Sequence, residues 1–319
     1  MWGSNLRSAS VNRRFVMLVL RRGALLGLVV LLVASLSGFG ASGSRRPLGK
    51  IVFAARANIG VGADIYSVNA DGTRLRRLTT SSADEAGPIW SPDGKSIAYV
   101  GGRSLYRMAA NGTKPRLLWT EDARFRSSIF DPAWSPDGRR IAFAAALVNG
   151  WTVWTYEFNG RLTQVTTRPG GHPSWSPTGG QLAYTGSDGG KSSVFVIGAN
   201  GSGDHDVSHA PVADESPVWS PNGKWIALRS LNADWRTREV DSLDIVSLDG
   251  KVRRTLTTGG AIFPAAWSPT SDAILFLRVE HPEKGALSPT QLFIVSVKGG
   301  TPRSLPGTNG AFGGASWHR

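Results

Sequence analysis

Short apolar runs, each bounded by turn residues, recur along most of the chain and predict β-strands. One kind of run, such as residues 97–100 and 141–143, follows a Pro-Asp-Gly turn and has the unbroken apolar character of a buried strand. A second kind, such as residues 105–108, ends at an Asp-Gly, Asn-Gly or Gly-Gly pair that favours a tight hairpin. The pattern therefore predicts a chain built from antiparallel hairpins.

The turn that opens each hairpin belongs to an internal repeat. Its first copy spans residues 88–99 and reads Pro-Ile-Trp-Ser-Pro-Asp-Gly-Lys-Ser-Ile-Ala-Tyr. Five further copies follow, the last cut short, and the repeated tryptophans are Trp90, Trp134, Trp175, Trp219, Trp267 and Trp317. Their spacings of 44, 41, 44, 48 and 50 residues are typical of propeller or solenoid architectures. Because they recur once per unit, we expect these tryptophans to pack between units and not to bind a ligand.

Each repeat contains four predicted strands. A short run at Pro-x-Trp-Ser is followed by the buried run, by the run that ends in the second turn, and by a polar edge run such as residues 77–79. Four antiparallel strands in about 45 residues correspond to one blade of a β-propeller. The chain opens with a second and third strand at residues 51–53 and 64–68 and closes with a first strand at residues 315–317. We therefore expect an all-β, six-bladed β-propeller of four-stranded antiparallel blades, one blade being closed jointly by the N- and C-terminal strands.

The N-terminus has the plan of a targeting segment. Residues 1–22 are basic, residues 24–36 are apolar, and small residues continue to position 44. This plan predicts a signal peptide or an N-terminal membrane anchor over residues 1–43, a linker over 44–49 and the propeller over 50–319. The arginine pairs leave both the general and the twin-arginine export routes open, and Met17 is an alternative start. We expect an exported, periplasmic or otherwise extracytoplasmic protein that contacts the membrane only through this segment, if it is not cleaved.

The net charge of +13 at first suggests nucleic-acid binding. Seven of the 36 basic residues and none of the 23 acidic ones lie in residues 1–46, however, so the repeat region carries only about +6. Its basic residues are scattered among acidic ones, and we expect no nucleic-acid partner. The absence of cysteine excludes disulfides, thiolate catalysis and cysteine metal sites.

The repeats resemble those of the TolB-type propeller, with its WD40-like WSPDG motif. The resemblance rests on Trp-Ser-Pro-Asp-Gly at 90–94 and 134–138 and on Asn-Ala-Asp-Gly-Thr at 69–73, and it covers residues 50–319. It implies a fold more than a function, because related propellers serve as binding scaffolds, gating domains of peptidases and lyases. In that family the channel mouth receives a peptidoglycan-associated lipoprotein. True TolB carries an α/β domain before its propeller, and we expect none between residues 44 and 50.

Strand direction alternates, so the connections of each blade divide between two faces of the ring. One face is predicted to hold the tight glycine turns and the other the variable loops, including residues 56–63, 230–241 and 278–289. Variable loops on a rigid scaffold often carry binding residues. Trp235, Arg236 and Arg238 lie in the second of these loops and outside the repeat. They form either a contact anchor at the rim or a loop that packs on its own blade.

The variable face also has the entrance to the central channel, which we expect to be lined by residues just before each repeat proline. The candidate binding residues are Glu85, Asp131, His172, Glu215 and Phe263. The four polar side chains would suit a cation or a basic or hydroxyl-rich ligand. The alternative is that they are simply solvated, and we expect neither a metal nor a cofactor.

No catalytic motif stands out. Gly-x-Ser-x-Gly does not occur, and only His172 of the five histidines falls at a channel position. The sequence favours an exported, monomeric, non-enzymatic propeller that binds a protein or envelope component at the long-loop face and channel mouth. The alternative is an extracytoplasmic lyase or hydrolase acting on a saccharide or lactone, with Glu85, Asp131, His172 and Glu215 as metal or acid–base residues.

Overall fold

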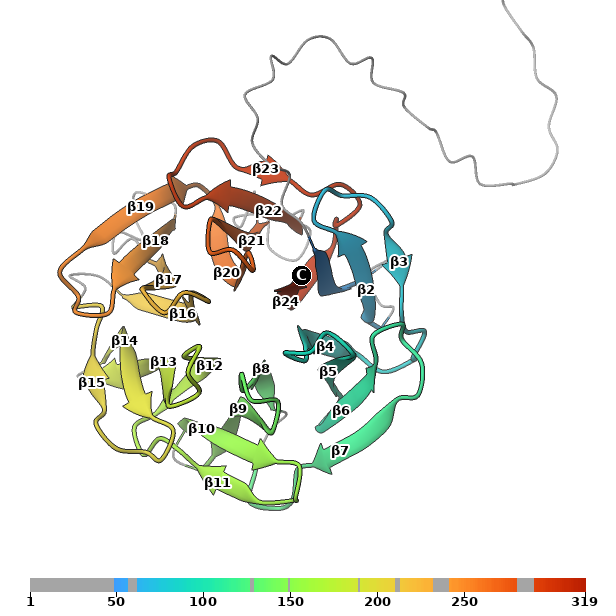
Figure 1. Cartoon of the computed structure of the whole chain (residues 1–319). Coiled ribbons are helices and arrows are strands. Elements are labelled where there is room, and N and C mark those ends of the chain that lie inside the picture. Colours follow the sequence, from blue (N-terminus) through green and yellow to red (C-terminus); the bar gives the residue numbers. More distant parts are fainter. Residues whose placement is uncertain are drawn as a thin grey trace, which may run out of the picture. The chain divides into compact units, whose positions relative to one another are not determined.

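The structure, a computed structural model, describes residues 49–56, 62–126, 129–148, 150–188, 190–209, 213–231, 241–279 and 290–319. Residues 45–319 form one compact unit. Six four-stranded sheets stand around a ring in this unit, which confirms the predicted six-bladed propeller (Figure 1). Within the described ranges, no helix has the length and apolar character needed to cross a membrane.

The strands follow the repeat, with the first strand of each blade innermost. Blade 1 contains β24 (Ala311–His318), β1 (Lys50–Ala55), β2 (Asp64–Asn69) and β3 (Arg76–Arg77), and blade 2 contains β4 (Glu85–Trp90), β5 (Ser96–Gly101), β6 (Ser104–Ala109) and β7 (Arg116–Thr120). Blade 3 contains β8 (Phe130–Trp134), β9 (Arg140–Leu147), β10 (Gly150–Glu157) and β11 (Leu162–Gln164), and blade 4 contains β12 (Gly170–Trp175), β13 (Gln181–Asp188), β14 (Lys191–Gly198) and β15 (His205–Asp206). Blade 5 contains β16 (Asp214–Trp219), β17 (Trp225–Ser230), β18 (Ser242–Ser247) and β19 (Arg253–Thr258), and blade 6 contains β20 (Ala261–Trp267), β21 (Ala273–Val279), β22 (Thr290–Ser296) and β23 (Arg303–Ser304).

Blade 1 closes the ring as predicted. Its inner strand β24 comes from the C-terminus and pairs with β1, with Ile51 opposite Trp317 and Phe53 opposite Ala315. Closure removes the open sheet edges at which a ring of blades would otherwise begin and end. Several outer strands are short; β3, β15 and β23 have two residues each.

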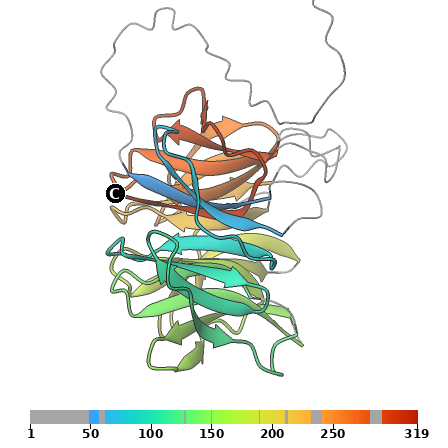
Figure 2. The same ribbon diagram turned by 90° about the vertical axis from the view of Figure 1, so that its right-hand side faces the viewer.

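The connections between strands divide the ring into two faces, which are seen edge-on in Figure 2. The tight-turn face, on the left in that view with the C-terminus, holds the first-to-second and third-to-fourth turns of each blade. The long-loop face holds the second-to-third loops and the connections from one blade to the next.

The hydrophobic core lies between neighbouring blades. One cluster packs Ile51 and Phe53 of blade 1 against Leu275 of blade 6, and others join the remaining blades in the same way. The repeat tryptophans belong to these seams: the Nε1–H of Trp175 in blade 4 donates to the Ala133 carbonyl of blade 3 (3.1 Å). Five of the six are between 4% and 8% exposed. They are packing residues, as the recurrence predicted.

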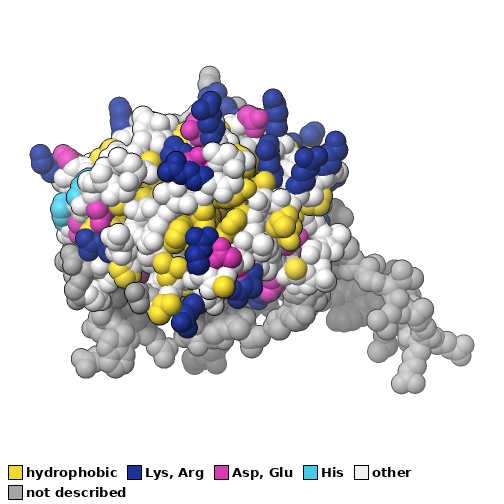
Figure 3. Space-filling view, turned by 90° about the horizontal axis from the view of Figure 1, so that it is seen from below, with side chains coloured by type: hydrophobic (Ala, Val, Ile, Leu, Met, Phe, Trp, Pro, Cys, Tyr) yellow, Lys and Arg dark blue, Asp and Glu magenta, His cyan; other side chains and the backbone are white. Residues whose placement is uncertain are grey.

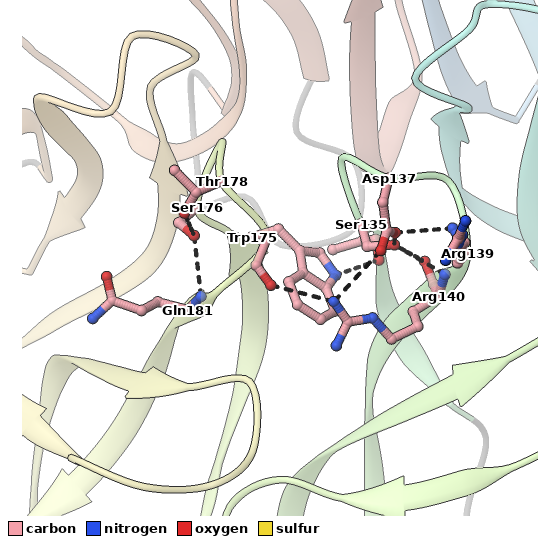
Figure 4. Close-up of polar contacts among 10 residues, drawn as sticks. Ser135, Asp137, Arg139, Arg140, Trp175, Ser176, Thr178 and Gln181 are labelled. Atoms are coloured by element: carbon pink, nitrogen blue, oxygen red, sulfur yellow. Dashed lines mark hydrogen bonds and ion pairs between the residues drawn. The ribbon is translucent and has the colours of Figure 1, made fainter.

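The Trp-Ser-Pro-Asp-Gly turn satisfies its own polar groups. In blade 3 the buried Ser135 Oγ donates to Asp137 Oδ1 (2.5 Å) and accepts the Arg140 N–H (2.9 Å) (Figure 4). Asp137 also accepts the Arg139 N–H (3.0 Å), while Gly138 takes the positive φ of 71° that the turn requires. The same Ser–Asp or Ser–Asn bond recurs in blades 2 and 5. The polar groups of the motif therefore bond to one another within the turn.

Candidate functional site

The inner strand of every blade bulges where it reaches the channel. In blades 2 to 5 the pairing with the second strand skips two residues, the second of which is the motif proline. Proline has no N–H to give to a ladder, and a bulge removes it from the pairing while re-aiming the residue before it. The residues before the prolines are Gly87, Asp131, His172 and Ser216.

These four residues share an unusual backbone conformation. Their φ angles lie between 49° and 56°, in the left-handed region that favours glycine. Three of them are nevertheless not glycine, and a side chain held in this region is strained by about 1 kcal/mol or more. The same backbone conformation therefore recurs in these four blades, and each blade has a different residue there.

The bulges surround a cavity of about 340 Å³ at the channel mouth. Asp131, His172, Ser216 and Phe263 contribute its varied side chains, and Gly313 and Gly314 of blade 1 leave their side of the wall open. The motif prolines of blades 2 to 6 and apolar residues next to them form the rest of the lining. The mouth is an apolar funnel with a small number of polar groups, the usual composition of a ligand pocket.

Of the five predicted mouth residues, the structure brings Asp131, His172 and Phe263 together at this cavity. Glu85 and Glu215 do not line it, because they lie three and two positions before the proline, and their blades present Gly87 and Ser216 instead. The side chain of Glu215 turns to Arg229 (3.9 Å), which pairs with Asp241 (2.7 Å).

Glu85 is buried in the seam between blades 1 and 2. Its backbone N–H donates to the Ala63 carbonyl (3.0 Å), and its side chain lies near Asp64 and Thr79. Burial raises the pKa of Glu85, Asp64 adds to the rise, and a hydrogen bond from Thr79 opposes it. One oxygen, Oε2, is buried without a hydrogen-bond partner among the described residues. Glu85 thus lies in the packing of the ring and not at the mouth.

Asp131 and His172 form a pair across the boundary between blades 3 and 4. His172 Nε2 lies 3.5 Å from Asp131 Oδ2, and both side chains are a little over 40% exposed. A carboxylate accepts hydrogen bonds, and an imidazole can both accept and donate them. The pair can therefore bind a cationic or hydrogen-bonding group, and the same two groups could exchange a proton with a ligand.

A second cavity, of about 570 Å³, opens outward from this pair between blades 3 and 4. Asp131 and His172 line both cavities, so the second one leads from the mouth toward the rim. Phe130 and Trp151 of blade 3 stand in its wall, with ring centroids 4.7 Å apart and planes at 54°.

The family of the chain follows from comparison with known proteins. The family model described as the TolB beta propeller domain matches residues 118–319, more than half of the chain. The chain belongs to this family. The match confirms the resemblance that the WSPDG repeats indicate.

Relatives of this TolB beta propeller domain include enzymes as well as TolB proteins. Dipeptidyl-peptidase 5 of Porphyromonas gingivalis is 24% identical over 303 residues, covering 76% of this chain; the chain spans only 43% of that protein. The crystal structure of TolB from Acinetobacter baumannii has a TM-score of 0.67 at 16% identity, over 84% of this chain and 66% of that one. An oligogalacturonate lyase in complex with manganese has a TM-score of 0.54 at 13% identity, over 79% and 77%. At these identities the structures show the shared fold alone.

Trp151 of this TolB-like chain is a cavity residue that the repeat pattern does not predict. The residue lies outside the repeat at the start of a third strand, so its departure from the repeat was a usable signal. Trp235, Arg236 and Arg238, predicted as rim residues, lie outside the described residues. The structure shows no group of three or more His, Cys, Asp or Glu arranged for a metal ion in the ranges it describes.

Proposed function

We propose that this TolB-like propeller is an exported, non-enzymatic scaffold that binds a protein partner of the cell envelope at the channel mouth on its long-loop face. The observation that carries the proposal is the contrast within the repeat: turn residues are repeated and satisfy one another, whereas the mouth positions differ from blade to blade. Strained backbone positions of this kind are common at binding sites. Because equivalent positions carry different side chains, the mouth is suited to a ligand that is not itself symmetric.

The composition of the mouth also supports a protein ligand. Phe263 and the motif prolines offer apolar surface, while Asp131 and His172 offer charge and hydrogen bonds. Interface centres that bind protein segments commonly combine an aromatic anchor with one or two polar groups. The export proposed here rests on the N-terminal pattern of residues 1–43 and on the extracytoplasmic setting of TolB proteins.

Photocrosslinking in cells tests the proposal. Phe263→p-benzoylphenylalanine replaces one aromatic side chain at the mouth by another, and Trp225→p-benzoylphenylalanine, at the tight-turn end of β17, is the matched control. We expect a light-dependent adduct with one envelope protein from position 263 and none from position 225. The same adducts from both positions, or none from position 263 in a folded and exported protein, would contradict the proposal.

A second candidate function is an enzyme, favoured by the Asp131–His172 pair at 3.5 Å and by the names of the peptidase relative and the lyase. In that case Asp131 would orient the imidazole and His172 would act as acid or base toward a saccharide or lactone. The test is turnover of oligogalacturonate and of simple lactones by the purified protein. Turnover that His172→Ala and Asp131→Asn both abolish would replace the scaffold proposal.

A further inference from the structure

We propose that the second cavity binds an aromatic side chain of a protein segment whose Lys or Arg, two residues further on, pairs with Asp131. The inference rests on the proposed function in one respect, that the ligand is a protein, and it adds the chemistry and the path of the bound segment. That path runs from the rim between blades 3 and 4 to the channel mouth.

The aromatic wall of the second cavity is exposed to solvent. Phe130 is 45% exposed and Trp151 is 36% exposed, whereas five of the six repeat tryptophans are no more than 8% exposed. Two large rings in mutual contact at the edge of a cavity form an apolar surface that water solvates poorly. Exposed aromatic groups next to a pocket are the usual anchors of protein interfaces.

Small residues leave space beside these rings. Ala144 and Gly171 face each other across the blade boundary, and a Cβ added to Gly171 would meet only the Ala144 Cβ, at 3.3 Å. Both residues line the cavity. A larger side chain at either position would fill the space beside the rings, so the cavity depends on these two small residues.

The described lining of the second cavity contains one acidic side chain, that of Asp131. Asp131 lies at the inner end of the cavity, where the second cavity meets the mouth. Neither cavity has a Lys or Arg among its described lining residues, and the imidazole of His172 contacts Asp131. A half-exposed carboxylate in an apolar wall is complementary to a cation, and it would repel an acidic ligand.

The lining favours a peptide over a saccharide. A saccharide presents many hydroxyl groups, and buried hydroxyls need hydrogen-bond partners. Apart from Asp131, His172 and the Trp151 indole N–H, the second cavity offers only the polar side chains of Thr185, Ser187 and Ser192, against rings, proline, alanine and glycine. Side chains two residues apart in an extended peptide point the same way, about 7 Å apart, which suits one anchor at the rings and one at the neighbouring carboxylate.

The experiment follows the Trp151 indole N–H by NMR in ¹⁵N-labelled protein of residues 45–319, the unit that contains both partners of every paired strand. The probes are capped peptides with the cores Trp-Gly-Lys and Trp-Gly-Gln. We expect both to shift the Trp151 signal, with the Lys peptide binding about fivefold more tightly, as one partly exposed ion pair allows. Asp131→Asn should remove that fivefold difference, because it weakens the Lys peptide more than the Gln peptide.

Trp151→Ala should weaken both peptides, and Trp225→Ala is the matched control that should weaken neither. Two results would overturn the inference: shifts at Trp151 from a neutral chito-oligosaccharide but not from the peptides, or equal effects of Asp131→Asn on both peptides. The outcome is separate from that of crosslinking, because peptides can bind this cavity even if position 263 captures no partner, and a partner captured at 263 can bypass the cavity.

Discussion

The two faces of the ring are held together in different ways. On the tight-turn face, hydrogen bonds join residues two to five apart, as from Ser135 to Asp137, and the arrangement recurs in several blades. Toward the long-loop face, buried acids pair with arginines from other strands: Asp214 in β16 pairs with Arg253 in β19, 39 residues away. Local bonds are set by the motif itself, whereas each distant pair needs matching residues from two strands, as in Asp64–Arg77 of blade 1 and Asp244–Arg253 of blade 5.

Exposed charge follows the same division. Figure 3 views the ring from its rim, and Lys and Arg side chains gather toward the edge of the tight-turn face. Lys95 and Lys251 at turn tips are 82% and 81% exposed. Both lie near exposed acids of their own turns, Asp93 and Asp249, whereas arginines of the long-loop side pair with largely buried acids, as Arg103 does with Glu121 and Arg229 with Asp241. The basic side chains at the turn tips of the tight-turn face are thus largely solvated, whereas these arginines of the long-loop face are held in specific ion pairs.

The largest effect should come from breaking a distant pair. Arg253 donates to both oxygens of Asp214 (2.7 and 2.9 Å) and to Asp244 (2.7 Å), and both carboxylates are almost fully buried. Arg253→Met would leave two buried negative charges without their partner, so we expect a loss of about 3–5 kcal/mol in the free energy of unfolding. Denaturant melts measure it.

The control is the neighbouring Arg254→Met, which removes an exposed guanidinium lying 4.7 Å from the centre of the Trp225 ring and should cost about 1 kcal/mol or less. Adding Asp214→Asn and Asp244→Asn to Arg253→Met should recover part of the loss. An Arg253→Met variant as stable as the Arg254→Met variant would show that the distant pairs do not stabilise this side of the ring.

A smaller loss is expected from a local bond of the tight-turn face. Ser135→Ala removes a buried hydroxyl and leaves the Arg140 N–H without its partner, which should cost about 1–2 kcal/mol. Ser247→Ala removes the same bond from the third-to-fourth turn of blade 5, where the Val252 N–H is exposed and water can replace the hydroxyl. The cost there should be smaller, and equal melts for the two variants would contradict this explanation.

The same difference explains what could be predicted from the sequence. Six blades, their strands and the closure by β1 and β24 follow from a repeated turn whose glycine and proline act locally. The position of Asp131 and His172 at the mouth follows from the repeat as well. The burial of Glu85 does not, because it depends on Asp64 and Thr79 of the preceding blade. Nor does the contact of Phe130 with Trp151, which joins two strands across a blade.

The strained mouth can be tested by comparing glycine with alanine. At an ordinary exposed position alanine is the more stabilising of the two, because glycine gives the unfolded chain more freedom. At Asp131, where φ is 49°, alanine keeps the strain and glycine relieves it. We expect Asp131→Gly to be more stable than Asp131→Ala by about 1 kcal/mol. The matched pair Arg116→Gly and Arg116→Ala, in β7, should show the opposite order; the same order at both positions would argue against strain at the mouth.

The smallest effect should be on how stability depends on pH. Two carboxyl groups are compared, Glu85 in the seam between blades 1 and 2 and Asp93 in a turn of the tight-turn face. Burial raises the pKa of Glu85, so its contribution to stability is greatest when it is protonated and falls as the pH rises from its ordinary value, near 4.5, through the raised pKa. Asp93 in the blade 2 turn accepts bonds from Ser91 and from the Lys95 N–H, which lower its pKa, so its contribution is present above its ordinary value and is lost as the pH falls through the lowered pKa.

The two amide variants should therefore move in opposite directions. Relative to the unsubstituted protein, Glu85→Gln should gain melting temperature as the pH rises from 4 to 7, and Asp93→Asn should lose it as the pH rises from 2 to 5. The Asp93→Asn change should be slight, because Asn222 holds the equivalent turn of blade 5 with the same serine bond (2.8 Å). Thermal melts across these ranges measure both, and a Glu85→Gln variant whose melting difference is flat with pH would show that the seam carboxyl is solvated like those of the turns.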